Sequence, residues 1–187
     1  MVDISLIRDI VAIAGVLIAL TYYVLTLRNQ KRTRQAQLLM ELYESYRNPE
    51  SRKRSMDIQL WDWNTLDEFF DRYSSLVNPD EWSDWEAIAS FFHGVGVLLK
   101  ADMIDIELLD RLLTNSVNRH WNALRMGQVL VEWRKRMKTD RGERDYWVDP
   151  EFGEDFFDQI RDSTFHGFDY LYYELVKYRK EHPITTT

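Results

Sequence analysis

The chain of 187 residues has no cysteine and only 7 glycines and 4 prolines. Without cysteine it can form no disulfide framework, thiolate zinc site, iron–sulfur cluster or cysteine nucleophile. The scarcity of glycine and proline argues against a turn-rich β architecture and against glycine-rich phosphate loops. A net charge of -7 argues against a general nucleic-acid-binding protein. With 45% hydrophobic residues the chain can still bury a core, which excludes wholesale disorder.

Residues 10–27 form the longest stretch without a charged side chain. As a helix this stretch is about 27 Å long, close to the ~30 Å hydrocarbon core of a bilayer, and we expect a transmembrane helix. A buried core helix is the alternative, but a core helix of this length normally shows a polar stripe. A cleaved signal peptide is the other alternative, but a positive amino-terminal region and a small-residue cleavage site are both missing.

The residues that flank this stretch predict its orientation. Residues 1–9 have a net charge of -1, whereas four basic residues follow the stretch directly. Lysine and arginine accumulate on the cytoplasmic side, so we expect residues 1–9 outside the cell membrane and everything after residue 27 in the cytoplasm. Two tyrosines stand near the cytoplasmic end, where interfacial aromatic residues gather. The residues expected at this membrane interface are Arg28, Lys31, Arg32, Arg34, Tyr22 and Tyr23.

Three small residues share one face of the predicted transmembrane helix. Ala12, Gly15 and Ala19 are spaced three and four residues apart, and Gly15 and Ala19 form a small-xxx-small pair. Such spacing allows two helices to approach closely in lipid. We therefore name Ala12, Gly15 and Ala19 the small-residue face and consider it a possible contact between two copies.

The rest of the chain has helical patterning, with apolar residues three and four apart and no stretch that alternates with period two. The juxtamembrane residues 28–47 lack glycine and proline, so we expect the first helix to run over 4–47. Capping residues mark the later helices: Asn48, Thr65 (with Glu68), Asn78 and Asp105. The expected helices are 49–60, 65–76, 79–101, 105–114, 116–138 and 153–181, the last broken near Gly167, with a loop at 139–152.

Short links between these helices predict antiparallel neighbours packed in a bundle. The sequence therefore predicts an all-α fold in which one N-terminal transmembrane helix continues into a cytoplasmic helical domain over residues 48–182, followed by a tail at 183–187. Residues 87–99 are apolar but too short to span a bilayer, so we expect a buried central helix there. Gly94 and Gly96 lie within it and indicate close helix packing rather than a dinucleotide motif.

No group of residues predicts catalysis, a cofactor or a metal ion. His93 and His120 belong to none of the spacings typical of metal sites, and we expect each to be a partly buried histidine with a hydrogen-bond partner. The serines stand in no nucleophile motif. The acidic residues between 145 and 158 suit a solvated loop and a first helical turn.

Two further basic clusters follow the membrane-proximal one. The cluster at residues 52–54 lies about 25–30 Å beyond it if the helix runs straight. It could fold back to the membrane or meet an acidic face of the bundle. The cluster at residues 134–138 ends a predicted helix, where positive charge complements the helix dipole.

Several segments together resemble those of a known group of proteins: Leu27–Gln30 after the anchor, Trp61 and Trp63, Ala89–Leu99, Met103–Glu107, His120 with Trp121, Trp133–Arg136, and Phe168–Tyr172. In this order they resemble a family of small single-pass prokaryotic membrane proteins catalogued as a domain of unknown function. The resemblance implies a membrane-tethered helical cytoplasmic domain and transfers no catalytic residue.

We therefore expect a membrane-anchored interaction module, such as an accessory or assembly subunit of a membrane-associated complex. Its expected partners are the lipid bilayer and either another protein or a second copy of the chain. One alternative is a membrane-tethered sensor that signals through the small-residue face. The other is an enzyme with a site near His93 or His120.

Overall fold

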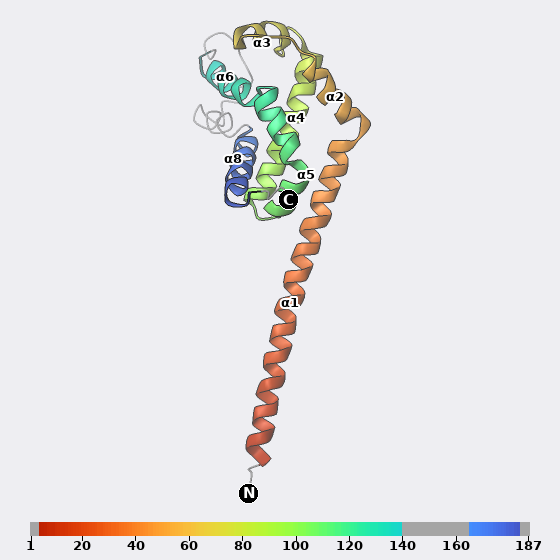
Figure 1. The fold of residues 1–187 in the computed structure, drawn as a ribbon, viewed down its shortest axis with the longest axis vertical. Helices are drawn as coiled ribbons and strands as arrows, with labels where there is room; N and C mark the ends of the chain where they lie inside the picture. The colour runs from red at the N-terminus through yellow and green to blue at the C-terminus, as the bar shows by residue number, and fades with distance from the viewer. Residues whose placement is uncertain (1–3, 140–164, 184–187) are drawn as a thin grey trace, which may run out of the picture.

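The computed structural model describes residues 4–139 and 165–183 of the chain. These residues contain seven α-helices and one π-helix and no strand, which confirms the all-α fold. The helices form a long rod with a bundle at one end (Figure 1). Most of the predicted loop at 139–152, and the part of the predicted last helix before residue 165, lie outside the described residues.

The rod is helix α1 (Ile4–Arg47), which is continuous over 44 residues as predicted and about 66 Å long. Its amino-terminal half leaves the bundle, and the N-terminus lies at the far end (Figure 1). The large hydrophobic side chains from Val11 to Leu27 are between 46% and 73% exposed. Within the described residues, α1 is the one helix that is long and apolar enough to cross a membrane.

The carboxyl-terminal half of α1 packs against the bundle. The side chain of Gln35 donates to the backbone carbonyl of Asp102 at 3.0 Å, and Leu39 is fully buried. Further along, the ring of Tyr46 stacks on Phe91 at a centroid distance of 5.1 Å. One uninterrupted helix therefore carries an exposed apolar half and a half that belongs to the folded domain.

Four helices begin at the predicted capping residues. They are α2 (Pro49–Gln59), α3 (Leu66–Tyr73), α4 (Pro79–Lys100) and α5 (Ile106–Asn118). In each, the capping side chain accepts a backbone N–H three residues on, at 2.8–3.4 Å. At α3 the carboxylate of Glu68 also accepts the N–H of Asn64 at 2.9 Å, which satisfies a second amide at this helix start. Helix α3 ends three residues earlier than predicted, because Ser74 has an extended backbone.

The predicted boundary at residue 115 and the predicted unbroken helix over 116–138 are wrong. Helix α5 continues to Asn118 and passes directly into the π-helix η1 (Arg119–Ala123). The chain then breaks, and α6 (Met126–Thr139) begins after Arg125, whose φ angle is 53°. The guanidinium of Arg125 lies 3.5 Å from the ring centroid of Trp63 and donates to its carbonyl, so a contact with a distant segment holds this break.

Helix α4 is the centre of the bundle, as predicted for residues 87–99. It packs along α8 (His166–Glu181), which begins after Phe165 in the left-handed conformation. The expected break near Gly167 thus appears as a helix start. Gly96 and Gly167 are both buried at this contact, and a Cβ on Gly96 would lie 1.7 Å from the carbonyl oxygen of Gly167. Gly96 therefore serves close packing, whereas a Cβ on Gly94 would meet no atom within 4 Å.

Candidate functional site

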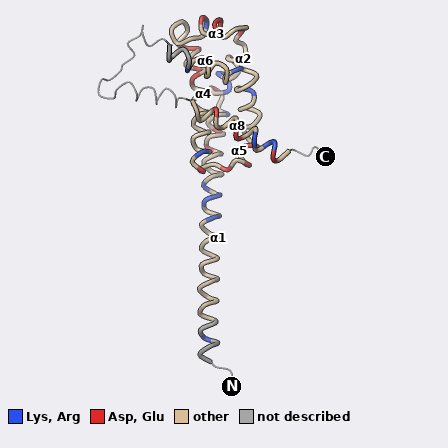
Figure 2. Tube along the Cα trace, turned by 90° about the vertical axis from the view of Figure 1, so that its left-hand side faces the viewer, with Lys and Arg blue, Asp and Glu red and all other residues tan. Residues whose placement is uncertain are grey.

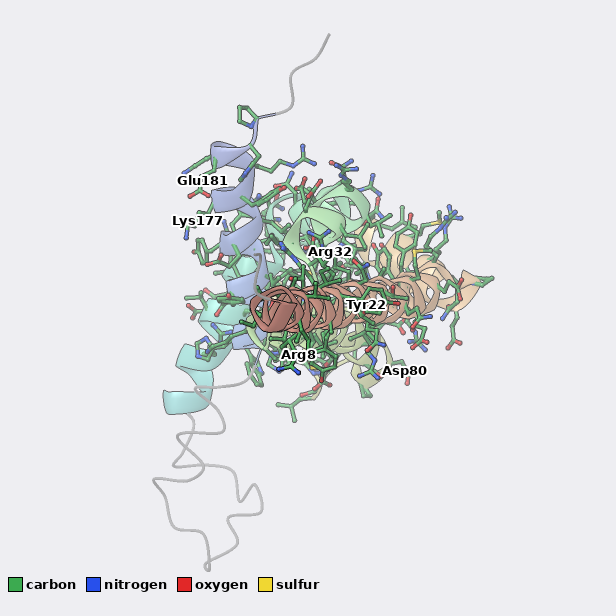
Figure 3. All side chains as sticks on the ribbon, turned by 90° about the horizontal axis from the view of Figure 1, so that it is seen from below. Arg8, Tyr22, Arg32, Asp80, Lys177 and Glu181 are labelled. Carbon is green, nitrogen blue, oxygen red and sulfur yellow. The ribbon has the colours of Figure 1, made fainter. Side chains whose placement is uncertain are left out.

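The six residues predicted at the membrane interface lie on the exposed part of α1. Tyr22 and Tyr23 are 73% and 60% exposed. Figure 2 shows the apolar stretch of α1 without charge colours, followed by basic turns beneath the bundle. In the view from below, Tyr22 and Arg32 lie on the rod in front of the bundle (Figure 3). Arg28 and Arg34 are also exposed, and Lys31 pairs with Asp102 of the bundle.

The small-residue face of α1 is uncovered in the single chain. Ala12, Gly15 and Ala19 are exposed, and a Cβ on Gly15 would meet no atom within 4 Å. The structure therefore leaves this face accessible to lipid or to a second helix.

His93 is half-buried and has a structural partner, as expected from the sequence. Its Nδ1 accepts the backbone N–H of Gly167 at 3.0 Å, so it joins α4 to the start of α8. Burial lowers the pKa of His93 below its ordinary value. This bond lies inside the contact between two helices, which suits a structural role for His93.

His120 is fully buried rather than partly buried, and it has two partners. Nδ1 lies 2.8 Å from the carbonyl of Ser116, so Nδ1 carries the proton and donates. Nε2 then accepts the hydroxyl of Ser55 at 3.0 Å. Burial lowers the pKa of His120 to about 4, and the charge of Arg119 acts in the same direction. The imidazole is therefore neutral at pH 7.

The Ser55–His120 pair has the contact distance of a nucleophile and a general base but not the matching chemistry. An effective base has a pKa near the working pH, and a group with a pKa of about 4 takes up a proton poorly. The group that orients the imidazole is a backbone carbonyl, which cannot stabilise an imidazolium as a carboxylate does. The pair is better suited to fix the position of Ser55 than to activate it.

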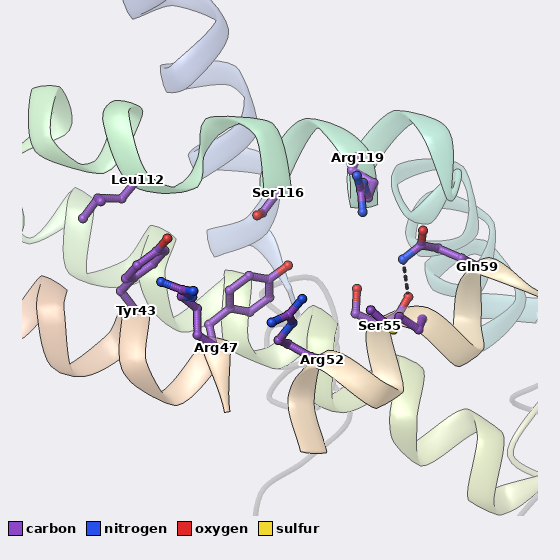
Figure 4. A pocket seen from close by; sticks show the side chains of 10 residues that line it. Tyr43, Arg47, Arg52, Ser55, Gln59, Leu112, Ser116 and Arg119 are labelled. Carbon is purple, nitrogen blue, oxygen red and sulfur yellow. Dashed lines mark hydrogen bonds between the residues drawn. The ribbon is translucent and has the colours of Figure 1, made fainter. Parts of the chain in front are cut away.

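Ser55 lies on the wall of a cavity of about 400 Å³ where α1, α2, α5 and η1 meet (Figure 4). We call this cavity the arginine pocket, because three of its lining residues are arginines from three different elements. Tyr43 and Leu112 lie at one end, and Ser55 and Arg119 lie at the other (Figure 4). The lining residues are Tyr43, Tyr46, Arg47, Arg52, Ser55, Met56, Gln59, Leu112, Ser116 and Arg119.

The lining of the arginine pocket contains no carboxylate. Among the described residues, Arg47, Arg52 and Arg119 form no ion pair; Arg47 lies 5.4 Å from the ring centroid of Tyr43. The nearby Arg54, in contrast, forms an ion pair with Asp84 on α4 at 3.0 Å. The cluster at residues 52–54 therefore divides, with one arginine meeting an acidic residue of the bundle and another facing the pocket.

Sequence reasoning identified parts of this pocket but not the pocket itself. It selected His120 and the basic cluster that contains Arg52, but it missed Arg47, Arg119 and Tyr43. Tyr43 and Arg47 lie one helical turn apart on α1, which is a weak sequence signal on its own.

The described residues contain no group of three or more metal-ligating side chains.

Comparisons of the chain with protein-family models, with curated proteins and with solved structures find no match.

Proposed function

We propose that this protein is a single-pass inner-membrane protein whose helical domain serves as an interaction module on the cytoplasmic side. The observation that carries the proposal is the construction of α1, which is exposed and apolar over its first half and part of the bundle over its second. With no hinge residue between Val16 and Arg47, the helix holds the domain at a set distance from the anchor. The resemblance to small single-pass prokaryotic membrane proteins leads to the same proposal.

The basic residues at the end of the apolar stretch support the orientation. Arg28, Arg32 and Arg34 are exposed on α1 just beyond the apolar side chains, where anionic headgroups of the inner leaflet would meet them. Each such charge contributes on the order of 1 kcal/mol near an anionic surface. Residues 1–9 carry no basic excess, so the amino terminus is the end that we place outside.

The end of the bundle farthest from the anchor offers apolar surface to a partner protein. α3 lies at this end (Figure 1). Leu60, Leu76 and Val77, on the segments that flank α3, are 81%, 57% and 60% exposed. The ring of Trp61, next to Leu60, stacks at 4.3 Å on Tyr73, the last residue of α3. Large apolar side chains exposed on the segments that flank one helix favour a contact surface there.

Protease treatment of spheroplasts and photo-crosslinking in cells test the two parts of this proposal. Protease added outside the cells should leave the domain intact, and cleavage of the domain would overturn the orientation. A photoreactive residue at Leu60 or Leu76 should give a discrete protein adduct, whereas one at the exposed Lys177 should give none. A lone monomer after detergent extraction, with no adduct at Leu60 or Leu76, would overturn the interaction module.

A sensor is a second candidate, because α1 contributes directly to the arginine pocket. Tyr43, Tyr46 and Arg47 line the pocket and belong to the same uninterrupted helix as the small-residue face. A ligand in the pocket would contact the helix that enters the membrane. Replacing Gly15 and Ala19 together by leucine should reduce self-association in membranes. Unchanged self-association and unchanged signalling would remove this candidate.

A further inference from the structure

We propose that the arginine pocket binds a small phosphorylated molecule from the aqueous phase, with the phosphate among Arg47, Arg52 and Arg119. This inference goes beyond the proposed function and does not depend on it, because it rests on the bundle alone. Three guanidinium groups from α1, α2 and η1 surround one cavity, and the cavity lining has no carboxylate to neutralise them. Guanidinium groups bind phosphate through paired, charge-assisted hydrogen bonds.

The three arginines of the pocket lie in a domain that is acidic as a whole. Residues 55–187 contain 15 basic and 26 acidic residues, a net charge of -11. Other arginines of the described bundle form ion pairs, for example Arg111 with Glu107 and Arg179 with Asp110. Arg47, Arg52 and Arg119 are exposed to solvent, and with no carboxylate in the lining their guanidinium groups can donate to an anion that enters the pocket.

The remaining lining residues suit the uncharged part of a ligand. A phosphate ion alone would leave most of a 400 Å³ cavity empty, since cavities of about 300–1,000 Å³ hold drug-sized molecules. Tyr43 and Leu112 offer aromatic and apolar surface at the end of the pocket away from Arg119 (Figure 4), and Met56 adds apolar surface to the lining. The hydroxyl groups of Tyr46 and Ser116 can donate hydrogen bonds to oxygen atoms of the ligand.

Ser55 and His120 form a fixed part of the wall. Because Nε2 of His120 accepts the Ser55 hydroxyl, the serine oxygen is left with its lone pairs for a donor on the ligand. Gln59 donates to the carbonyl of Ser55 at 2.7 Å, so its amide is held at the same end. The phosphate would therefore accept hydrogen bonds from the arginines, and a hydroxyl or amine of the ligand would donate to the Ser55 oxygen.

Two sources could supply the phosphate, a lipid headgroup or a dissolved molecule, and the geometry favours the second. Twenty residues of straight helix separate Leu27, at the end of the apolar stretch, from Arg47. At 1.5 Å per residue this is about 30 Å, beyond the reach of a headgroup in an undistorted bilayer. It is also several times the screening length of about 8 Å at physiological salt.

The test uses the full chain in nanodiscs made only of phosphatidylcholine, with phenyl phosphate as the probe and isothermal titration calorimetry as the measurement. Phenyl phosphate should bind saturably and more tightly than inorganic phosphate, and phenol should not bind. Arg52→Gln and Arg119→Gln should each weaken binding by about tenfold or more. Arg111→Gln is the matched control, because Arg111 is an exposed arginine of α5 outside the lining, and it should change the affinity less than about twofold.

Far-UV circular dichroism establishes that each variant is folded before its affinity is compared. The proposal is overturned if phenyl phosphate fails to bind up to about 10 mM, or if both pocket variants bind it as tightly as the unaltered chain. A second set of nanodiscs contains phosphatidylglycerol. An unchanged affinity for phenyl phosphate in these nanodiscs supports a dissolved ligand. If phosphatidylglycerol instead weakens phenyl phosphate binding to the unaltered chain but not to Arg52→Gln, the lipid occupies the pocket and the dissolved source is overturned.

Discussion

The carbonyl oxygen of Gly167 lies 1.7 Å from the position that a Cβ atom on Gly96 would occupy. Helices α4 and α8 therefore touch backbone to backbone at this point. The neighbouring bond from the N–H of Gly167 to His93 depends on the same close approach, since it spans only 3.0 Å. At this contact between α4 and α8 no side chain can be accommodated on Gly96 without moving a backbone.

Gly96→Ala should destabilise the folded domain by about 3 kcal/mol or more, because a backbone atom blocks the added methyl group and the two helices must separate. Thermal unfolding followed by circular dichroism measures the loss. Gly94→Ala is the matched control on the same helix, where a Cβ meets open space, and it should be neutral or stabilising by up to about 1 kcal/mol. Equal effects of the two substitutions would contradict the close packing.

The buried His120 should make stability depend on pH. Its pKa is about 4 in the folded chain and about 6.5 in the unfolded chain, so below pH 6.5 the unfolded state binds a proton that the folded state does not. The stability tied to this difference is fully present above pH 6.5. It should be lost as the pH falls toward 4, by on the order of 3 kcal/mol.

Urea unfolding at a series of pH values measures this dependence, and His120→Gln provides the comparison. Carboxylates and His93 also titrate in the acid range, so the informative quantity is the difference between the two chains. The variant should lose less stability than the unaltered chain between pH 6.5 and 4. The same slope in both chains would show that His120 does not remain neutral in the fold.

Arg125→Lys should destabilise the domain by about 1–2 kcal/mol. A lysine keeps the charge, but it loses the contact of the guanidinium with the Trp63 ring at 3.5 Å and the pair of terminal nitrogens that donate separately to the carbonyls of Trp63 and Asn64. Arg111→Lys should change the free energy of unfolding by less than about 0.5 kcal/mol, because Arg111 forms only an exposed ion pair. Chemical denaturation of both variants checks this, and similar losses in the two would overturn the role given to Arg125.

Two ion pairs on α5 should differ in strength because they differ in burial. The side chain of Asp110 is 10% exposed and bonds Arg179 of α8 and Thr114, whereas Glu107 is 57% exposed and pairs with Arg111 on its own helix. Asp110→Asn should cost about 2 kcal/mol, since Arg179 then lacks a carboxylate at a partly buried site. Glu107→Gln should cost less than about 0.5 kcal/mol. Urea unfolding distinguishes the two, and an equal cost would contradict the contrast.

The features of the fold that were predictable from sequence are local ones. Asn48, Thr65, Asn78 and Asp105 mark their helices because a cap is made between residues three apart. The length of α1 was predictable for the same reason, as nothing between residues 16 and 47 interrupts a helix.

The break at Arg125 and the arginine pocket were not predictable in this way. Residues 123–126 are good helix formers, and the contact that ends the helix comes from Trp63, which is 62 residues away in sequence. The pocket likewise joins α1, α2 and η1, and Ser55 is 65 residues from His120. A single sequence contains the side chains of such a site but not their neighbours in space.

The register of α1 sets the direction in which each domain would lie in a pair of chains. Gln35 and Leu39 face the bundle and are buried, and each follows a member of the small-residue face, Gly15 or Ala19, by twenty residues. At 3.6 residues per turn, twenty residues leave two side chains about 160° apart around the helix axis. Two copies joined through Gly15 and Ala19 would therefore hold their bundles on the outer flanks, back to back.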